Sequence, residues 1–281
     1  MIARLLRSSI QIVPWKYRTK VKNWPVIGPL QRWVIQRFLA QGQFLHTVNA
    51  GPAKGLRYWI QLPDDKAVWT GTYELNFSTA LSEAVQKNDV CLDIGGYRGF
   101  FSGVFALAGA REVHSFEPLP ANNKKIRALI EANPELPLRL HEVAVGAEVG
   151  EAEFSIMPED SMGKLSTSSF QEKQHGKDIL TVQIETLDHL RATNVIPGAQ
   201  VVKIDVEGAE AMVLKGGMKF FRSEQPRVFI EIHSRGLAKE CYELLTQLGY
   251  TVRVLETNRA PDFHSEPEVC HFVAMAPKFI A

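Results

Sequence analysis

From residue 88 onwards, short apolar runs alternate with amphipathic stretches along most of the chain. The apolar runs predict strands, and stretches whose apolar residues recur every three or four positions predict helices. The expected strands are 89–94, 112–116, 138–145, 151–156, 180–184, 201–205, 227–232, 250–255 and 269–274, and the expected helices are 100–108, 120–132, 208–215 and 237–248. This alternation is typical of a doubly wound α/β fold with a mostly parallel sheet. No clear helix separates the last two strands, which predicts an antiparallel hairpin at the sheet edge.

The first 60 residues lack this regularity, and four prolines there interrupt any long helix. The best helical pattern among them covers 30–39. Residues 1–63 contain ten Lys or Arg, four of the five tryptophans and no Asp or Glu, whereas 64–281 hold 22 basic and 31 acidic side chains. We therefore predict two parts, a basic, Trp-rich N-terminal extension over 1–63 and the main domain over 64–281.

Three interpretations of the extension are open. It is a cap packed on the main domain, a surface for a partner, or a cationic aromatic patch that contacts an anionic membrane. We favour the cap because extensions of catalytic domains commonly close a site. The basic residues are scattered and match no recognition module, so we expect no nucleic-acid binding. A longer polar, Ser-rich stretch over 159–178 is expected to be a loop.

The three cysteines, Cys91, Cys241 and Cys270, are widely spaced and predict neither a disulfide framework nor a zinc site. Cys91 lies in an apolar run, where a small buried side chain is expected. No apolar run is long enough to span a membrane, and the arginines within residues 1–13 do not suit a signal peptide. These features predict a cytoplasmic protein, with peripheral membrane contact through 1–63 left open.

A glycine-rich turn follows the first regular strand, in the string DIGGYRG at 93–99. Glycine lets the chain turn sharply and lets a ligand approach the backbone closely. The spacing is D-x-G-x-x-x-G and not the G-x-G-x-x-G of dinucleotide sites. A pyrophosphate favours free helix N–H groups without a nearby carboxylate, whereas a ligand with an ammonium and a sulfonium tolerates Asp93. A plain strand-to-helix turn would also favour these glycines.

Glu117 ends the next strand, 24 residues after Asp93, and the following Pro118 forces its backbone to be extended. In doubly wound folds, an acid about 20 residues beyond the glycine turn accepts hydrogen bonds from ribose hydroxyls. A Glu at a strand end is by itself usually solvated, but the interval between these two motifs is specific. Together they predict an adenosyl ligand, and the acid at Asp93 favours S-adenosylmethionine over a dinucleotide.

Three carboxylates follow the apolar strand 201–205 in the string KIDVEGAE at 203–210. The carboxyl ends of parallel strands form the edge at which such folds bind ligands. Asp205, Glu207 and Glu210 are therefore candidates to hold the methionine part of the cofactor, to bind a divalent cation or to accept a proton. Glu207 and Glu210 equally suit a helix start. We predict no metal site, keep a cation as an alternative, and assign a functional role to Asp205.

Two polar residues, Glu231 and His233, alternate with apolar ones in the string FIEIH at 229–233, so both point to one side of that strand. We expect His233 at the same sheet edge as Asp205, where a histidine is a candidate general base. A lone histidine is more often structural or on the surface. Asp205 and His233 are the candidate catalytic residues.

Together, these segments resemble the FkbM-type methyltransferase family over about residues 70–275. The strings that carry the resemblance are GTYE at 71–74, LDIG at 92–95 with Gly99, FEP at 116–118, TLD at 186–188, KIDVEGAE at 203–210 followed by VLKG at 213–216, and IEI at 230–232. The family usually has Ala-Asn where this chain has Gly96-Tyr97. The resemblance implies the class I methyltransferase fold, a Rossmann-like, mostly parallel sheet of seven strands, here with an N-terminal extension.

The resemblance implies an S-adenosylmethionine-dependent methyltransferase that modifies a hydroxyl of a sugar, glycan or other small metabolite. We assign cofactor binding to Asp93, Gly95, Gly96, Gly99, Glu117 and Ala144, the last by resemblance because adenine is expected there. Two alternatives stay open. One is an NAD-dependent oxidoreductase, which the absent G-x-G-x-x-G argues against, and the other is a non-catalytic protein that docks to a membrane or a partner through 1–63.

Overall fold

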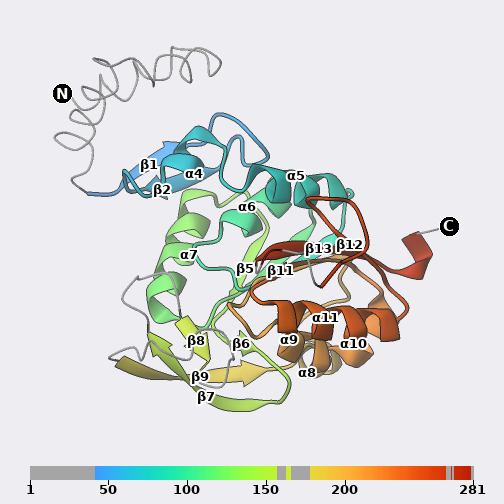
Figure 1. Cartoon of the computed structure of the whole chain (residues 1–281). Coiled ribbons are helices and arrows are strands. Elements are labelled where there is room, and N and C mark those ends of the chain that lie inside the picture. The colour runs from blue at the N-terminus through green and yellow to red at the C-terminus, as the bar shows by residue number, and fades with distance from the viewer. Residues whose placement is uncertain (1–41, 157–162, 166–177, 264–266, 268, 280–281) are drawn as a thin grey trace, which may run out of the picture.

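The computed structural model describes residues 42–156, 163–165, 178–263, 267 and 269–279. The helix expected over 30–39 lies outside these residues. Figure 1 shows a central sheet with helices on both faces and a smaller sheet at one end. Among the described helices, none combines the length and the apolar character needed to cross a bilayer.

The central sheet has seven strands in the order β12-β13-β11-β10-β3-β4-β5. The strands are β3 (Val90–Ile94), β4 (Glu112–Phe116), β5 (Leu138–His141), β10 (Val201–Ile204), β11 (Arg227–Ile232), β12 (Thr251–Val254) and β13 (Cys270–Met275). The pairs from β11 to β5 are parallel. Strand β13 pairs antiparallel with both β11 and β12. The predicted doubly wound sheet and its antiparallel edge are thus confirmed.

Helices cover both faces of this sheet (Figure 1). One face carries α5 (Leu75–Ala84), α6 (Phe100–Leu107) and α7 (Pro120–Ala132), and the other α8 (Leu187–Ala192), α9 (Glu210–Lys215), α10 (Met218–Glu224) and α11 (Arg235–Gln247). Two apolar cores result, one on each face. Removing this apolar surface from water is the main force that holds helices and sheet together. Cys91, Cys241 and Cys270 are buried free thiols in these cores, as predicted for Cys91.

Among the helices on the sheet, α5, α8 and α10 were not predicted. Helices α8 and α10 have too few residues for a periodic pattern, and α5 precedes residue 88, where the regular pattern begins. The side chain of Thr186 caps α8 by accepting a hydrogen bond from the His189 amide. Gly216 and Gly217 end α9 as expected, and α10 then begins at Met218. The glycine pair is therefore a break between two helices and not the end of the helical region.

A second, four-stranded sheet lies beside the central one, in the order β6-β9-β7-β8. Its strands are β6 (Ala144–Val145), β7 (Gly150–Ile156), β8 (Gly163–Leu165) and β9 (Asp178–Glu185). The single strand predicted over 138–145 was wrong, because β5 ends at His141 and the chain then enters this other sheet. The loop predicted over 159–178 contains β8, and its other residues lie largely outside the described ones.

An antiparallel hairpin precedes the main domain, formed by β1 (Phe44–Thr47) and β2 (Arg57–Ile60) and followed by α4 (Lys66–Thr70). Leu56 and Tyr58 are buried in the same core as α6. The Asn133 side chain at the end of α7 exchanges two hydrogen bonds with the backbone of Arg57. The described part of the predicted extension is therefore packed on the helical layer, while the boundary at residue 63 stays a prediction.

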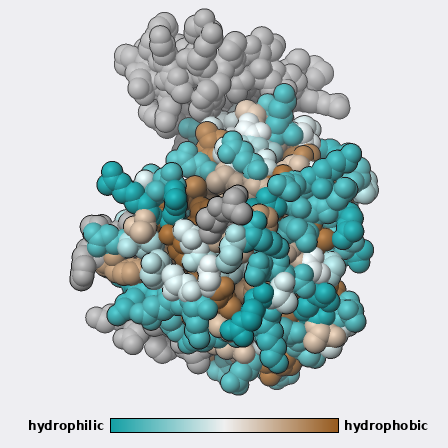
Figure 2. Space-filling view, turned by 90° about the vertical axis from the view of Figure 1, so that its right-hand side faces the viewer, coloured by the Kyte–Doolittle hydropathy of each residue, from teal (hydrophilic) through white to brown (hydrophobic). Residues whose placement is uncertain are grey.

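The surface turned toward the viewer in Figure 2 is mostly hydrophilic, and its hydrophobic residues form small separate groups. On the hairpin itself, Leu45 and Trp59 are the large apolar side chains that stay exposed, at 44% and 39%. Isolated apolar residues at a surface are common in soluble domains. The part of the extension that the structure describes thus buries most of its apolar side chains.

Candidate functional site

The glycine turn joins β3 to α6 in the predicted place. Gly95 and Gly99 have positive φ angles of 81° and 77°, which glycine adopts without strain. A β-carbon would lie 1.7 Å from the Asp205 carbonyl oxygen at Gly95, 2.1 Å from Ser115 Oγ at Gly96 and 2.6 Å from Leu129 Cδ2 at Gly99. The three glycines therefore let the turn pack against β10, β4 and α7. Of the three, only Gly95 lines the cavity described below.

Asp93 lies beneath this turn and not on the cavity wall. Its side chain is fully buried, accepts a hydrogen bond from Ser102 Oγ at 2.6 Å and lies 3.1 Å from Lys203 Nζ. Lys203 also donates to the Gly95 carbonyl oxygen at 2.8 Å and lies 3.2 Å from Asp205. In this structure the Asp93 carboxylate holds Lys203 and the turn, and the direct cofactor contact of Asp93 stays a prediction.

Glu117 is buried at the tip of β4 and lines the cavity. One carboxylate oxygen accepts a hydrogen bond from the Tyr97 amide at 2.8 Å, and the other accepts from the Leu119 amide and from Asn122. Burial raises the pKa of Glu117 to about 7, against the lowering effect of these hydrogen bonds. The side chain is thus fixed in position with acceptor capacity left for a ligand hydroxyl.

A cavity of about 410 Å³ opens at the carboxyl ends of β3, β4 and β10. Its wall near Glu117 includes the residues Phe116, Pro118, Leu119, Val143, Ala144, Val145 and Phe154. The predicted adenine neighbour Ala144 therefore lines the same cavity as Gly95 and Glu117. Tyr58, Asp65, Tyr73 and Arg98 from the hairpin, α4 and the glycine turn line it as well. An apolar pocket with a few convergent polar groups is typical of small-molecule sites.

Another part of the cavity lining, the acidic end, is formed by carboxylates. Its carboxylates are Glu74, Asp205, Glu207 and Glu231. Burial, with the nearby charge of Glu231 adding to it, raises the pKa of Asp205 despite the opposing effect of Lys203. Asp205, directly after β10, and Glu231 on β11 therefore line the same part of the cavity.

His233 lies at this edge, as predicted, but in a setting that changes its expected protonation. Its Nδ1 lies 2.7 Å from Glu210, and its Nε2 lies 3.4 Å from Glu207 and 3.8 Å from Asp205. Burial would lower the pKa of His233, but the hydrogen bond to Glu210 and these charges raise it to about 9. An imidazolium has no free lone pair, so at neutral pH His233 is suited to hold carboxylates and not to accept a proton.

Tyr97 occupies the position where the family usually has Asn. Its φ angle is 49°, in the left-handed region that asparagine adopts more readily than tyrosine. The aromatic ring lies outside the turn, within 6 Å of the Arg98 guanidinium and the Lys125 ammonium. The backbone amide of Tyr97, and not its ring, makes the contact with Glu117 that holds the turn.

Sequence reasoning missed the roof of the cavity, formed by Tyr58, Asp65, Tyr73 and Glu74. The Asp65 carboxylate pairs with Arg98, and Arg98 also donates to the Trp59 carbonyl oxygen. A signal for Glu74 was present, since it ends the GTYE string that carries part of the family resemblance. No pattern in the sequence indicated that α4 and the hairpin reach over the glycine turn.

Fold and cavity together are those of a doubly wound α/β protein with a ligand site at the carboxyl ends of its strands. The family model of the methyltransferase FkbM domain matches residues 93–252, which is more than half of the chain. The chain therefore belongs to the FkbM methyltransferase domain family, and its seven-stranded sheet is the class I methyltransferase fold.

A named relative is the hexuronic acid methyltransferase AglP of Haloferax volcanii, 26% identical over 185 residues, which are 65% of this chain and 72% of AglP. Among solved structures, the FkbM methyltransferase of Methylobacillus flagellatus KT is 15% identical with a TM-score of 0.44. The match covers 75% of this chain but only 56% of that one. A putative methyltransferase from Streptococcus mutans is 15% identical, with a TM-score of 0.48 over 89% of this chain and 64% of its own.

Proposed function

We propose that this protein is an S-adenosylmethionine-dependent O-methyltransferase whose acceptor is a sugar hydroxyl. The observation that supports this most is one cavity whose lining has two unlike parts. Gly95, Glu117 and Ala144 belong to one part, and the carboxylates around Asp205 and Glu231 form the acidic end. Membership of a methyltransferase family fits this arrangement.

The residues at the first end fit an adenosyl group. Glu117 is positioned to accept hydrogen bonds from ribose hydroxyls. Apolar side chains beside it, including Leu119 and Phe154, suit the faces of an adenine ring next to Ala144. Gly95 lets the methionine part pass close to the backbone. Asp93 acts one layer below, by fixing Lys203 and through it the carbonyl of Gly95.

Asp205 is the residue we propose as the proton acceptor. When bound, S-adenosylmethionine supplies a methyl carbon on a sulfonium, and the C–S electron pair returns to sulfur as the acceptor oxygen bonds to that carbon. The hydroxyl proton passes to the Asp205 carboxylate, whose raised pKa brings it closer to neutral pH than an ordinary aspartate. His233 keeps the surrounding carboxylates in place through Glu210 and Glu207. The pocket otherwise orients the two reactants and excludes water.

A sugar hydroxyl is the proposed acceptor for two reasons. The relative AglP is by name a hexuronic acid methyltransferase, and carboxylates such as Glu74 and Glu231 are good acceptors for several hydroxyls at once. A polyhydroxylated ring therefore suits the acidic end of the cavity. The glycan, its linkage and the position that is methylated are open to experiment.

Calorimetry with S-adenosylhomocysteine tests the cofactor assignment. We expect binding by the full chain and at least tenfold weaker binding by the Glu117→Ala variant, on the order of the loss of charge-assisted hydrogen bonds. The matched control is Glu135→Ala, at an exposed glutamate in the turn after α7 with 61% of its side chain accessible. Equal affinities in wild type and Glu117→Ala would contradict the assignment.

Two further measurements separate the rival functions. Tighter binding of NAD than of S-adenosylhomocysteine would favour an oxidoreductase. Transfer of a labelled methyl group to members of a panel of neutral sugars and uronic acids is the expected positive result. Cofactor binding without transfer to any hydroxyl acceptor would favour a non-catalytic docking protein instead.

A further inference from the structure

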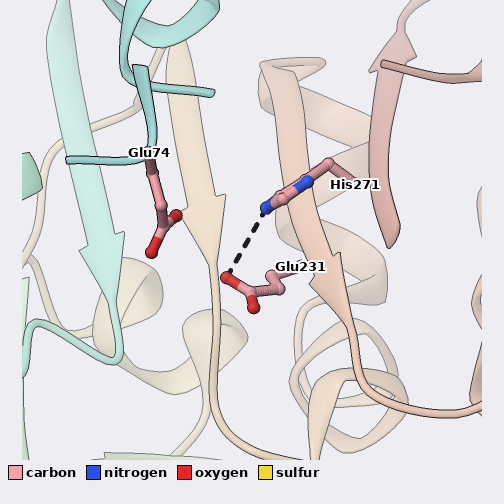
Figure 3. Close-up of side chains that lie close together, drawn as sticks. All are labelled: Glu74, Glu231 and His271. Atoms are coloured by element: carbon pink, nitrogen blue, oxygen red, sulfur yellow. Dashed lines mark ion pairs between the residues drawn. The ribbon is translucent and has the colours of Figure 1, made fainter. Parts of the chain in front are cut away.

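Three potential metal ligands converge beside the cavity, where Glu74 and Glu231 line its acidic end, and they come from three separate elements (Figure 3). Glu74 precedes α5, Glu231 lies on β11 and His271 lies on β13. One ligand atom from each lies within 4.8 Å of the others. Glu231 and His271 are direct neighbours across the antiparallel pair β11–β13, with His271 Nε2 3.6 Å from a Glu231 oxygen.

Two atoms of this group are buried without a hydrogen-bond partner among the described residues. They are Glu74 Oε2 and His271 Nε2. A buried polar atom without a partner is costly, and such atoms in native proteins usually mark a bound ion, a water or a function. Figure 3 shows the Glu74 carboxylate and the His271 ring on either side of Glu231, so the two atoms without partners approach one place.

The second ring nitrogen of His271 is already fixed. Its Nδ1 lies 2.5 Å from a carboxylate oxygen of Glu256. Metal-binding histidines commonly pair one ring nitrogen with a carboxylate in this way, which orients the other nitrogen toward the metal. The geometry around His271 therefore has both parts of that arrangement, the outer carboxylate and a buried Nε2 facing two further carboxylates.

Negative charge at this end of the cavity also favours a cation. Glu74, Glu231 and Asp205 all line it, and Glu207 lies beside them. The nearby cationic side chains, Lys203 and His233, are already engaged with Asp93, Asp205, Glu207 and Glu210. Burial would lower the pKa of His271, but Glu231 and Glu256 raise it to about 9, so a cation that binds at Nε2 displaces a proton from the ring. Carboxylates that share a low-dielectric pocket repel one another, and a divalent ion offsets this repulsion.

We propose that Glu74, Glu231 and His271 bind one divalent cation of the Mn²⁺ type, which holds two neighbouring oxygens of the acceptor beside the transferred methyl group. The ligand set of two carboxylates and one imidazole suits Mn²⁺, which accepts both oxygen and nitrogen ligands. Three protein ligands leave coordination positions for the acceptor. This inference rests on the proposed function, since it gives the acceptor a place in the same cavity.

The cation would act on the acceptor as a Lewis acid. Coordination lowers the pKa of the bound hydroxyl, whose proton passes to Asp205. The oxygen then gives an electron pair to the methyl carbon, and the C–S pair leaves with the sulfur of the cofactor. The cation keeps its oxidation state throughout. A sugar with two adjacent hydroxyls, or a hydroxyl next to a carboxylate, would bind through both oxygens.

The experiment is Mn²⁺ binding to the full chain after chelator treatment, with S-adenosylhomocysteine present, followed by electron paramagnetic resonance and calorimetry. We expect one bound ion per chain in wild type. Glu74→Gln and His271→Gln are each expected to weaken binding at least tenfold, and Glu256→Gln to weaken it by about tenfold. The matched control Glu243→Gln, on the exposed side of α11 with 65% of its side chain accessible, is expected to bind as wild type does.

The cofactor serves as the internal check on folding and on the proposed function. His271→Gln, Glu256→Gln and Glu243→Gln are expected to bind S-adenosylhomocysteine as wild type does, because none of these three residues lines the cavity. Wild-type protein that binds S-adenosylhomocysteine but takes up no Mn²⁺ would overturn the metal site and leave the proposed function standing. Equal Mn²⁺ affinity in wild type and in both ligand variants would also overturn it. Failure to bind S-adenosylhomocysteine would instead count against the proposed function.

Discussion

Lys203 Nζ lies 3.1 Å from the Asp93 carboxylate, and both side chains are almost completely buried. The same ammonium group donates to the Gly95 carbonyl oxygen and lies 3.2 Å from Asp205. One cation on β10 therefore connects the end of β3, the glycine turn and the proposed catalytic carboxylate. A buried charge is stable only when it is paired and hydrogen-bonded in this manner.

Replacing Lys203 by Met is expected to lower the free energy of unfolding by about 3–5 kcal/mol. Asp93 would then be buried without a counter-charge, and Asp205 would keep only the more distant His233. Urea denaturation followed by circular dichroism measures this loss. The double variant Lys203→Met with Asp93→Asn is expected to lose less than the sum of the two single changes, since the pair is then removed as a unit. Additive losses would show that the two side chains are not coupled.

A substitution at Tyr97 is expected to stabilise the fold. Its left-handed backbone conformation costs a tyrosine more than an asparagine, so Tyr97→Asn is expected to raise the free energy of unfolding by on the order of 1 kcal/mol. The contact between the residue-97 amide and Glu117 is kept, and affinity for S-adenosylhomocysteine is therefore expected to stay within about twofold. Thermal denaturation and calorimetry measure the two quantities. A lower melting temperature would show that the ring contacts with Arg98 and Lys125 outweigh the backbone strain.

Many strands and helices were predictable from local patterns, although the ten-residue helix α5 was missed. Strand β4, helix α7 and strand β11 have the predicted bounds, because apolar periodicity and clear breakers surround each of them. Helices α8 and α10 are too short to show periodicity, and the apolar run 138–145 does not reveal that it belongs to two sheets. Hydrogen-bond partners of strands are tertiary information, which a local pattern does not contain.

The site was predictable only in part, for a related reason. Spacing along the chain brought Gly95, Glu117 and Ala144 to one cavity. Asp93 lies two residues before Gly95, yet its side chain is buried beneath the turn, where it pairs with Lys203 of β10. The protonation of His233 depends on the balance between burial, which lowers its pKa, and Glu207 and Glu210, which raise it. The spacing of residues along the chain does not reveal this balance.

Glu117 is expected to make cofactor binding sensitive to pH. Burial raises its pKa to about 7, and ribose hydroxyls donate better to the ionised carboxylate than to the neutral acid. Affinity for S-adenosylhomocysteine is therefore expected to fall as the pH drops below 7, by up to about tenfold per pH unit. Calorimetry between pH 6 and pH 8.5 measures the slope. The Glu117→Gln variant is expected to bind more weakly and to lose most of this dependence, and an equal slope in that variant would contradict the assignment.

A histidine pair on β4 and β5 is expected to make the fold sensitive to acid. His114 and His141 are stacked, with Nδ1 and Nε2 2.9 Å apart, and His141 also stacks on Phe116. One of the two nitrogens must accept a hydrogen bond from the other, so the contact is lost when both rings are protonated. Burial and the charge of His114 lower the pKa of His141 to about 4, and burial also lowers the pKa of His114.

The direction of this effect follows from the unfolded chain, where both histidines titrate near 6.5. Above that pH the stability of the pair is fully present, and it is lost as the pH falls from 6.5 toward 4, because the unfolded state binds more protons. We expect a loss of about 2 kcal/mol, since His141 is only partly buried. Urea denaturation between pH 4.5 and pH 7.5 measures it. His141→Phe is expected to flatten the curve, whereas His189→Gln on the surface leaves it unchanged.

The last prediction concerns the connection between the cavity roof and the glycine turn. Arg98 donates to both carboxylate oxygens of Asp65 and to the Trp59 carbonyl oxygen, and its guanidinium lies 5.3 Å from the centre of the Tyr58 ring. The side chains of Arg98 and Asp65 are 12% and 7% accessible, so water competes little for these bonds. Arg98→Met keeps the length of the side chain and removes every donor.

We expect this variant to loosen β2 and α4 while leaving the central sheet intact. Amide hydrogen exchange is therefore expected to rise over 57–70 and to stay unchanged in β10 and β11. Since Tyr58 and Asp65 line the cavity, affinity for S-adenosylhomocysteine is expected to fall by about tenfold. Lys124→Met, which removes a basic side chain of α7 that makes no contact with Asp65, is the control. Faster exchange throughout the sheet would mean that Arg98 supports the whole domain, and unchanged exchange over 57–70 would mean that packing of Leu56 and Tyr58 alone holds the roof in place.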